Sequence, residues 1–512
     1  MTTDPALRRL AGATLLIPFP SRVPPRWVLD ELEDGLGGVV LFYFNIGGPR
    51  QLSDLTRRLR EAGGDPIVSL DEEGGDVTRL GHLTASPYPG NAALGAVDDT
   101  ALTRHVYRAL GADLRAVGVT LNLAPSVDVN AAEDNPVIGT RAFGADPQLV
   151  ARHGVAAIAG LHDAGVAACA KHFPGHGATR QDSHHALPTV DADLDELDGR
   201  ELPPFRAVIT AGVDAIMTAH VRIPAITGDD PATLSPAAIT GLLRGRLGYD
   251  GPVITDALEM RGASEALGVP EAAVRALLAG ADLLCLGAEQ GPEVIAATRD
   301  AIVVAVREGR LPAERLEEAA GRAARLRRAA VPQDEAAAPP TPAGPRPTVP
   351  SAGAHAPDGA PQDDADIGLA AARRAIRVHG TVTALDGPLI VEIASPPGMA
   401  VGNVPWGLGH WLPANGDTPT AELARVGPET DPAPLLARAH GRSLVVVVRD
   451  AHRYPAARAL VDRLVTERPD ATVVEMGIPA WRPATGTHVA TYGATAASAR
   501  AALELLLPSG PA

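Results

Sequence analysis

Residues 170–188, AKHFPGHGATRQDSHHALP, are the stretch around which the rest of the chain is organised. They include one lysine, four histidines and one aspartate, together with two glycines and two prolines. Because glycine and proline interrupt regular structure, these titratable side chains lie where the backbone turns. Such a concentration of polar chemistry is typical of a functional loop, with a purely structural loop as the alternative.

The residues on either side of Lys171 predict where this stretch lies in the fold. Residues 166–170 are small and apolar, which is typical of a strand buried on both faces. Lys171 and His172 are therefore expected at the C-terminal end of that strand. Pro174 and Gly175 prevent a continuing helix, so a loop is expected to follow.

Within this loop, Asp182 precedes His184 by two residues. In an irregular backbone, that spacing can bring a carboxylate against an imidazole ring, which fixes the tautomer of the ring and raises its pKa. A histidine held in this way can exchange a proton with a reacting group near neutral pH. The pair is therefore a candidate general acid/base.

The histidines of the loop also allow a metal-site interpretation, because zinc binds three or four His, Cys or carboxylate ligands. The candidate ligands would be His172, His176, His184 and His185. Against this interpretation, Lys171 would repel a cation, and no helical HExxH motif frames the histidines. His185 is the histidine most readily explained as a hydrogen-bonding scaffold. We expect no metal ion and no cofactor.

Up to Gly309, eight short apolar runs alternate with amphipathic segments. The runs span residues 13–19, 38–44, 67–70, 119–123, 166–170, 215–217, 253–255 and 283–286. Helices are expected between them, notably at 51–62, 102–117, 147–164 and 236–247. Eight successive βα units predict a (β/α)8 barrel of the TIM type.

Polar residues follow the ends of these runs. They are Asn45, Asp71, Asp128, Lys171, His172, His220 and Asp256. In such a barrel the C-terminal ends of all strands meet at one rim, where the active sites of this fold are built. The sequence therefore predicts a single site at that rim.

A change in composition divides the chain into a barrel, 1–330, and a second domain, 367–512. Residues 331–366 between them are dominated by Pro, Ala and Gly. Such a segment cannot bury enough apolar surface to offset the entropy lost on ordering, so it is expected to be a linker.

The second domain is expected to be a smaller α/β sandwich with a largely parallel sheet. Helices are expected at 367–376, 456–467 and 496–507, and strands at 389–393, 443–448 and 472–476. The loop 402–413, GNVPWGLGHWLP, contains His410 between Trp406 and Trp411. We expect this loop to pack locally, with contact to the barrel mouth as the alternative.

The composition indicates which kinds of molecule the protein is expected to bind. The hydrophobic content of 46% fits a globular protein, and the formal net charge of −16 argues against binding to nucleic acid or to an anionic membrane. Cys169 and Cys285 lie in apolar runs and are expected to be buried, reduced thiols. The first residues show no evident secretion signal or membrane span, so a cytoplasmic protein is the default, with non-standard export left open. The oligomeric state is left undecided.

The motif KHFPGHG at 171–177, followed by DSHHALP at 182–188, resembles the β-N-acetylglucosaminidase (β-hexosaminidase) branch of the family 3 glycoside hydrolases. Other matching segments occur in the same order: DEEGGDVTRL at 71–80, IGTRAFG at 138–144, MTAHVRIP at 217–224, PATLS at 231–235 and GPVITDALEM at 251–260. The resemblance covers nearly the whole predicted barrel. Residues 367–380 also resemble the second domain found in some members.

This resemblance implies a retaining, two-step mechanism through a covalent glycosyl-enzyme intermediate. Asp256 would be the nucleophile, His184 the general acid/base, and Asp182 the residue that orients His184. A helix N-cap is the structural alternative for Asp256. The family often has a second acidic residue after the nucleophile, where this chain has Ala257, which weakens the transfer of local contacts.

The resemblance also implies the substrate contacts. Asp71, Arg79, Arg141, Lys171 and His172 would bind the hydroxyl and acetamido groups of the terminal sugar. A structural salt bridge is the alternative for Asp71 and Arg79. Arg141 and Lys171 are harder to explain structurally, because two cations at one rim need acceptors.

The function implied is an exo-acting β-N-acetylglucosaminidase that removes terminal β-linked GlcNAc from muropeptides, in cell-wall recycling, or from chitin oligosaccharides. A phosphorylase, in which phosphate replaces water in the second step, is the close alternative. A histidine acid/base would not repel the incoming anion. A β-glucosidase fits less well, because the Asp182–His184 pair marks the GlcNAc branch. A sugar-binding protein without catalysis is the alternative from another class.

Overall fold

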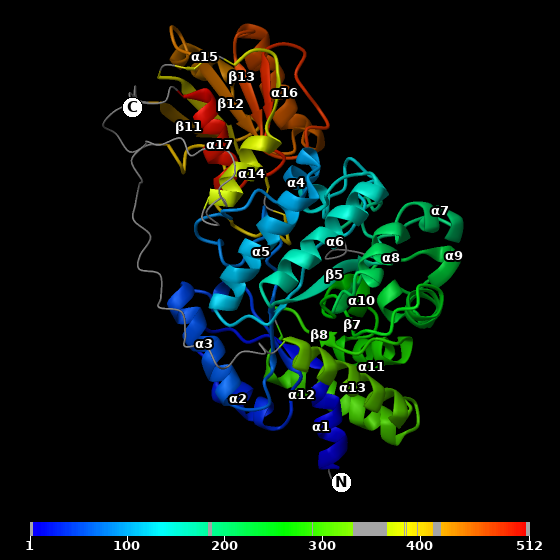
Figure 1. Cartoon of the computed structure of the whole chain (residues 1–512). Coiled ribbons are helices and arrows are strands. Elements are labelled where there is room, and N and C mark those ends of the chain that lie inside the picture. The colour runs from blue at the N-terminus through cyan, green and yellow to red at the C-terminus, as the bar shows by residue number, and fades with distance from the viewer. Residues whose placement is uncertain are drawn as a thin grey trace.

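The computed structural model of the chain describes residues 4–182, 187–288, 290–330, 366–382, 384–385, 387–396, 398–412 and 421–507. A barrel, coloured blue to green in Figure 1, is followed along the chain by a sheet domain coloured yellow to red. The predicted linker lies outside the described residues except for Asp366.

Eight short parallel strands form the barrel, and each overlaps a predicted apolar run. They are β1 (Leu15–Ile17), β2 (Gly38–Val40), β3 (Ile67–Leu70), β4 (Leu121–Asn122), β5 (Ala167–Phe173), β6 (Ala215–Thr218), β7 (Val253–Ile254) and β8 (Leu284–Cys285). The strands pair in the order β7-β6-β5-β4-β3-β2-β1-β8. Backbone hydrogen bonds between Leu283 and both Val253 (3.1 Å) and Thr255 (2.9 Å) link the two ends. The predicted TIM-like barrel is confirmed.

Amphipathic helices surround the strands. They are α1 (Pro5–Ala13), α2 (Arg26–Glu33), α3 (Pro49–Glu61), α4 (Asn91–Val97), α5 (Thr100–Ala116), α6 (Pro147–Asp163), α7 (Leu194–Gly199), α8 (Leu202–Thr210), α9 (Pro224–Thr227), α10 (Arg261–Ser264), α11 (Val269–Ala279), α12 (Pro292–Arg307) and α13 (Ala313–Ala330). Capping residues in the local sequence determine where several of these helices begin. Asp99 caps α5 by accepting from Leu102 N, and Asp146 caps α6 just before Pro147.

One predicted helix has a different geometry. Residues Ala237–Arg246 form a π-helix, in which each N–H bonds to the carbonyl five residues back. The spacing of apolar residues over so short a segment does not separate α- from π-helical turns. The position of this helix was predictable, and its type was not.

The second domain is built on a six-stranded sheet in the order β11-β10-β12-β13-β14-β9. Its strands are β9 (Arg377–His379), β10 (Leu389–Ile393), β11 (Glu422–Val426), β12 (Leu444–Val448), β13 (Thr472–Glu475) and β14 (Thr487–Ala490), and its helices are α14 (Ile367–Ala375), α15 (Pro432–Arg438), α16 (Pro455–Glu467) and α17 (Ala496–Leu506). Only the β9–β14 pair is antiparallel. The sequence missed β9 and β11 because these edge strands carry charged side chains that are exposed or partly exposed. It also missed the interior strand β14, whose residues THVA form no apolar run.

The two domains are in contact. Helix α14 lies beside α4 and α5 in Figure 1, and its Ile367 and Ala371 belong to the apolar core of the barrel. The buried carboxylate of Asp76, in the barrel, lies 3.1 Å from Arg449 Nη2 and accepts from Ala494 N at 2.9 Å. Both partners come from the second domain, so the interface contains a buried polar anchor as well as apolar packing.

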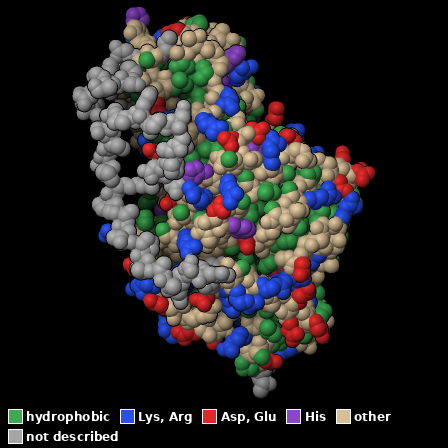
Figure 2. Space-filling model, in the orientation of Figure 1, with side chains coloured by type: hydrophobic (Ala, Val, Ile, Leu, Met, Phe, Trp, Pro, Cys, Tyr) green, Lys and Arg blue, Asp and Glu red, His purple; other side chains and the backbone are tan. Residues whose placement is uncertain are grey.

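The surface agrees with the composition. Figure 2 shows acidic and basic side chains interspersed over the viewed face, without a large patch of one sign. Within the described residues, no helix is long and apolar enough to cross a bilayer.

Candidate active site

A cavity of about 670 Å³, called the rim cavity below, opens at the C-terminal ends of the barrel strands. This volume falls in the range of small-molecule sites, roughly 300–1,000 Å³. Six residues predicted from the sequence line it: Asp71, Arg79, Arg141, Lys171, His172 and Asp256. The structure therefore brings together residues that are up to 185 positions apart in the chain (256 − 71 = 185).

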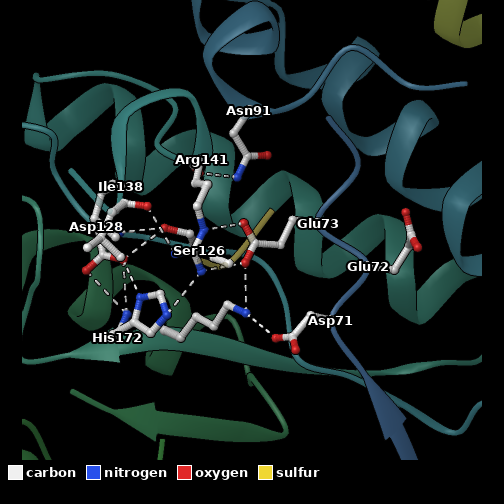
Figure 3. Close-up of polar contacts among 12 residues, drawn as sticks. Asp71, Glu72, Glu73, Asn91, Ser126, Asp128, Ile138, Arg141 and His172 are labelled. Atoms are coloured by element: carbon white, nitrogen blue, oxygen red, sulfur yellow. Dashed lines mark hydrogen bonds and ion pairs between the residues drawn. The ribbon is translucent and has the colours of Figure 1, made fainter. Parts of the chain in front are cut away.

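A charged cluster of Asp71, Glu73, Arg141 and Lys171 forms one wall of the rim cavity. Lys171 Nζ lies 2.6 Å from Asp71 Oδ1 and 2.8 Å from Glu73 Oε1. Arg141 contacts both oxygens of Glu73, with Nη2–Oε1 at 2.7 Å and Nε–Oε2 at 2.9 Å. Figure 3 shows Glu73 pointing toward Arg141, whereas Glu72 points away from it. Two cations and two carboxylates thus compensate one another in a nearly buried group.

This compensation fixes the charges of the cluster. Burial alone would raise the pKa of Asp71 and of Glu73. The neighbouring cations outweigh burial, so the pKa of each carboxyl lies below its ordinary value. Burial would likewise lower the pKa of Lys171, but Asp71 and Glu73 raise it. All four groups are therefore charged at neutral pH.

His172 is oriented by a buried carboxylate. It lies in β5, which extends three residues beyond the predicted strand end, to Phe173. Its Nδ1 is 2.7 Å from Asp128 Oδ2, and its Nε2 is 3.3 Å from Arg141 Nη2. Asp128 also accepts from the hydroxyl of Ser126 at 2.9 Å (Figure 3). Burial would raise the pKa of Asp128, but its interaction with His172 outweighs this and lowers it to about 2.

Asp256 follows β7 and lies in a turn that neighbouring strands hold in place. Its Oδ1 accepts from Ala257 N at 2.8 Å. The carbonyl of Ala257 accepts a hydrogen bond from Nε2 of His220, a buried residue that follows β6, at 2.9 Å. Glu259 accepts from Gly287 N at 2.7 Å, which ties the same segment to the end of β8. The carboxylate is thereby presented to the rim cavity.

The structural alternative for Asp256 does not hold. The next helix, α10, begins at Arg261, and Met260 occupies its N-cap position. Asp256 therefore does not cap this helix.

The second domain contributes residues 399–404 to the wall of the rim cavity. Arg79 joins them to the charged cluster, because its Nη1 donates to Ala400 O at 3.1 Å while its Nη2 lies 3.5 Å from Asp71 Oδ2. The salt bridge considered for Asp71 and Arg79 is therefore present. The expectation that loop 402–413 packs locally is wrong for residues 402–404, although Trp406 and Trp411 do pack against the apolar core of their own domain.

The predicted acid/base pair is only partly within the described residues. Asp182 is described and half-buried, whereas His184 lies outside the described residues together with His185. The contact between Asp182 and His184 stays a prediction. Among the described residues, no group of three or more His, Cys, Asp or Glu side chains is arranged to hold a metal ion.

Sequence reasoning missed three parts of the site. Glu73 has a signal in DEEGG, because it stands two residues after Asp71 and can therefore face the same side of an extended segment. Asp128 was expected at the rim but was given no role. Residues 399–404 had no signal, since Ala400 stands 321 positions from the arginine that it contacts.

A parallel barrel with a carboxylate and a buried charged cluster around one rim cavity defines an enzyme that binds a small polar substrate. Comparison with known proteins identifies its class. Residues 23–326 match the family model described as the glycosyl hydrolase family 3 N terminal domain. The chain belongs to glycosyl hydrolase family 3, and it is a glycoside hydrolase.

Individual relatives agree with this assignment. The chain is 38% identical over 304 residues to the beta-hexosaminidase LpqI of Mycobacterium tuberculosis, covering 57% of this chain and 76% of that protein. It is 37% identical over 285 residues to beta-hexosaminidase A of Pseudoalteromonas piscicida, a match covering 51% of this chain and only 47% of that protein. A solved family 3 beta-N-acetylglucosaminidase from Paenibacillus has a TM-score of 0.83 at 35% identity, with 99% of this chain and 97% of that chain covered.

Proposed function

We propose that the chain is a retaining exo-β-N-acetylglucosaminidase that removes terminal β-linked GlcNAc from muropeptides or chitin oligosaccharides. The observation that carries the proposal is that Asp256, the charged cluster and His172 all line the rim cavity. The names of the relatives, beta-hexosaminidase and beta-N-acetylglucosaminidase, support the choice of sugar.

In the first step, Asp256 attacks the anomeric carbon, and the bond to the leaving oxygen breaks. His184, oriented by Asp182, gives its proton to that oxygen, so the aglycone leaves as an alcohol. A glycosyl ester of Asp256 remains. In the second step, His184 takes a proton from water, whose oxygen attacks the anomeric carbon. The bond from that carbon to Asp256 breaks, which restores the carboxylate and releases GlcNAc with retained configuration.

The charged cluster would bind the sugar before the first step. Asp71 accepts hydrogen bonds from hydroxyl groups, while Arg79, Arg141 and Lys171 donate to hydroxyl and acetamido oxygens. These side chains already hold one another at 2.6–3.5 Å, so little ordering is needed when the sugar enters. A sugar without the partner group would leave buried donors unpaired, which gives the site its selectivity.

One assay tests the proposal. The purified protein is incubated with an aryl β-GlcNAc and an aryl β-glucoside, with and without phosphate, and the sugar product is identified. Free GlcNAc from the first substrate alone is expected. GlcNAc-1-phosphate would instead establish a phosphorylase, and release of glucose a β-glucosidase. Sugar binding without release would establish a binding protein.

The cellular setting follows from the natural aglycone. Muropeptides would place the enzyme in cell-wall recycling in the cytoplasm, and chitin oligosaccharides in carbohydrate uptake. Comparing kcat/KM for a GlcNAc-bearing muropeptide and for chitobiose decides between the two substrates.

A further inference from the structure

A second cavity, of about 340 Å³ and called the domain cavity below, plays no part in the mechanism above. It lies in the second domain, where Ser395 and Arg449 follow the C-terminal ends of β10 and β12. Ligands of open parallel sheets bind at this edge, because the strand ends and the loops after them form a crevice there. The domain cavity thus occupies the part of its fold where binding sites are built.

The wall of the domain cavity combines an aromatic ring with fixed polar groups. Trp406 is half-buried at the wall. Beside it, the carboxylate of Glu392 is almost fully buried and accepts from Gly409 N at 2.7 Å and from Arg425 Nε at 3.0 Å. An indole face packs against the C–H face of a pyranose ring, while carboxylate and guanidinium groups bind its hydroxyls. This composition suits a sugar ring.

The charges favour a neutral sugar over an acidic peptide. Two arginines line the domain cavity, but each is already paired with a carboxylate. Arg425 is paired with Glu392 at 3.0 Å, and Arg449 with Asp76 at 3.1 Å. An anionic ligand would therefore meet compensated cations and a buried carboxylate.

The domain cavity lies next to the rim cavity, because residues 402–404 line both. The rim cavity in turn has large apolar side chains that are exposed: Tyr43 (56%), Leu83 (64%) and Met399 (59%). These three are among only seven large apolar side chains exposed in the described part of the chain. Their gathering in one cavity indicates a ligand-contacting surface.

We propose that the two cavities form one groove for a β-linked sugar chain, with the domain cavity as a distal subsite for a sugar of the aglycone. The proposal rests on the proposed function, which places the terminal GlcNAc in the rim cavity. The second sugar then lies along Tyr43, Leu83 and Met399, and a further sugar stacks on Trp406. The enzyme is thereby selective for oligosaccharides longer than a disaccharide.

The test is the dependence of kcat/KM on chain length, measured with chitobiose, chitotriose and chitotetraose beside an aryl β-GlcNAc. In the unaltered chain, kcat/KM is expected to rise ~10-fold or more from chitobiose to the longer chains, a gain of the size that one aromatic contact provides. Trp406→Ala is expected to remove most of this gain and leave hydrolysis of the aryl substrate unchanged, because Trp406 does not line the rim cavity.

Trp411→Ala is the matched control, since Trp411 lies in the same loop and packs against the same apolar core but lines neither cavity. It should keep the full gain. Arg425→Gln tests the groove with a side chain that can still donate a hydrogen bond to the buried carboxylate of Glu392. It is expected to reduce the gain several-fold.

Equal kcat/KM for all chain lengths in the unaltered chain would overturn the distal subsite, as would a gain that survives both Trp406→Ala and Arg425→Gln. A gain seen with a muropeptide but not with a glycan of equal length would also overturn it, in favour of a peptide site. Absence of GlcNAc release from every substrate, the aryl compound included, would instead refute the proposed function.

Discussion

Arg141 and Glu73 form a two-point ion pair at the C-terminal rim of the barrel, with both nitrogen–oxygen distances below 3 Å. The same carboxylate also holds Lys171 at 2.8 Å. Glu73 is 2% exposed, so it is the buried counter-charge for two cations that the sequence alone left without an acceptor.

Replacement of this counter-charge is expected to destabilise the protein. Glu73→Gln leaves Arg141 and Lys171 buried without the carboxylate that bridges them, which should cost about 3–5 kcal/mol of unfolding free energy. Urea denaturation measures this loss.

Glu72→Gln is the matched control for that experiment. Glu72 is equally buried, but burial raises its pKa to about 7, and it accepts from the backbone N–H groups of Arg79 and Leu80 rather than from a cation. A glutamine oxygen can accept the same bonds, so the loss should stay within about 1 kcal/mol. Equal losses for the two variants would contradict the assigned role of Glu73.

The nucleophile can be tested without disturbing its turn. Asp256→Asn keeps the shape of the side chain and an oxygen that can accept from Ala257 N. Because the amide cannot form the glycosyl ester, kcat should fall ~10⁴-fold or more. Binding of GlcNAc, followed by calorimetry, should persist. Turnover within tenfold of the unaltered enzyme would remove Asp256 from this role.

The acid/base is tested by the leaving group. His184→Ala should lower kcat/KM by ~10²- to 10⁴-fold for chitobiose, whose leaving alcohol needs a proton. The loss in kcat/KM should be far smaller for an aryl substrate with an acidic phenol, since the phenolate leaves without receiving a proton. Equal losses for the two substrates would argue against proton donation by His184. Asp182→Asn should also lower kcat/KM more for chitobiose than for the aryl substrate, but both losses should be smaller than for His184→Ala.

Acid stability should depend on Asp128. Its folded-state pKa is about 2, below the ordinary value of 3.8, so its contribution to stability is present above the ordinary value and is lost as pH falls toward 2. The contribution amounts to ~2 kcal/mol. The difference in urea stability between the unaltered chain and Asp128→Asn should therefore narrow as pH falls from 5 to 3. A difference in stability that stays constant over this pH range would contradict the lowered pKa of Asp128.

Two arginines of the second domain give a matched test of the interface. Arg449 and Asp76 form a pair with side chains 11% and 2% exposed, whereas Arg374 and Asp99 are 51% and 34% exposed. Arg449→Ala leaves a buried carboxylate without its cation and should cost about 3–5 kcal/mol. Arg374→Ala should cost at most about 1 kcal/mol. Urea denaturation of both variants is the measurement, and a larger loss for Arg374→Ala would contradict the buried anchor.

Much of the fold could be predicted because its signals are local. Each barrel strand is buried on both faces and therefore reads as an apolar run, and the residue after each run falls at one rim. The same reasoning failed for β9 and β11, whose edge positions allow polar side chains, and for the interior strand β14, which begins with Thr and His rather than with an apolar run. It also assigned no role to Glu73, although its position two residues after Asp71 allows both side chains to face the cavity.

The residues of the site could be predicted only where they belong to a recognisable sequence motif. Lys171 and His172 directly follow the predicted apolar run 166–170, and the structure places them at the end of β5, beside Asp71 and Arg141. Residues 399–404 reach the same cavity through tertiary packing of a second domain, for which adjacent sequence holds no information. Contact between the two domains depends on the shapes of their surfaces and on buried polar pairs, and the hydrophobic periodicity of the sequence reports neither.

Arg79 reaches the second domain through the backbone carbonyl of Ala400, a group that every amino acid supplies. Side chains at 399–404 can therefore be replaced over evolutionary time without loss of that bond, while the barrel residues around the terminal sugar stay the same. Preference for the aglycone is thus free to diverge separately from recognition of the sugar that is cleaved. A library randomised at 399–404 alone should accordingly yield variants with altered leaving-group preference and an unchanged glycon.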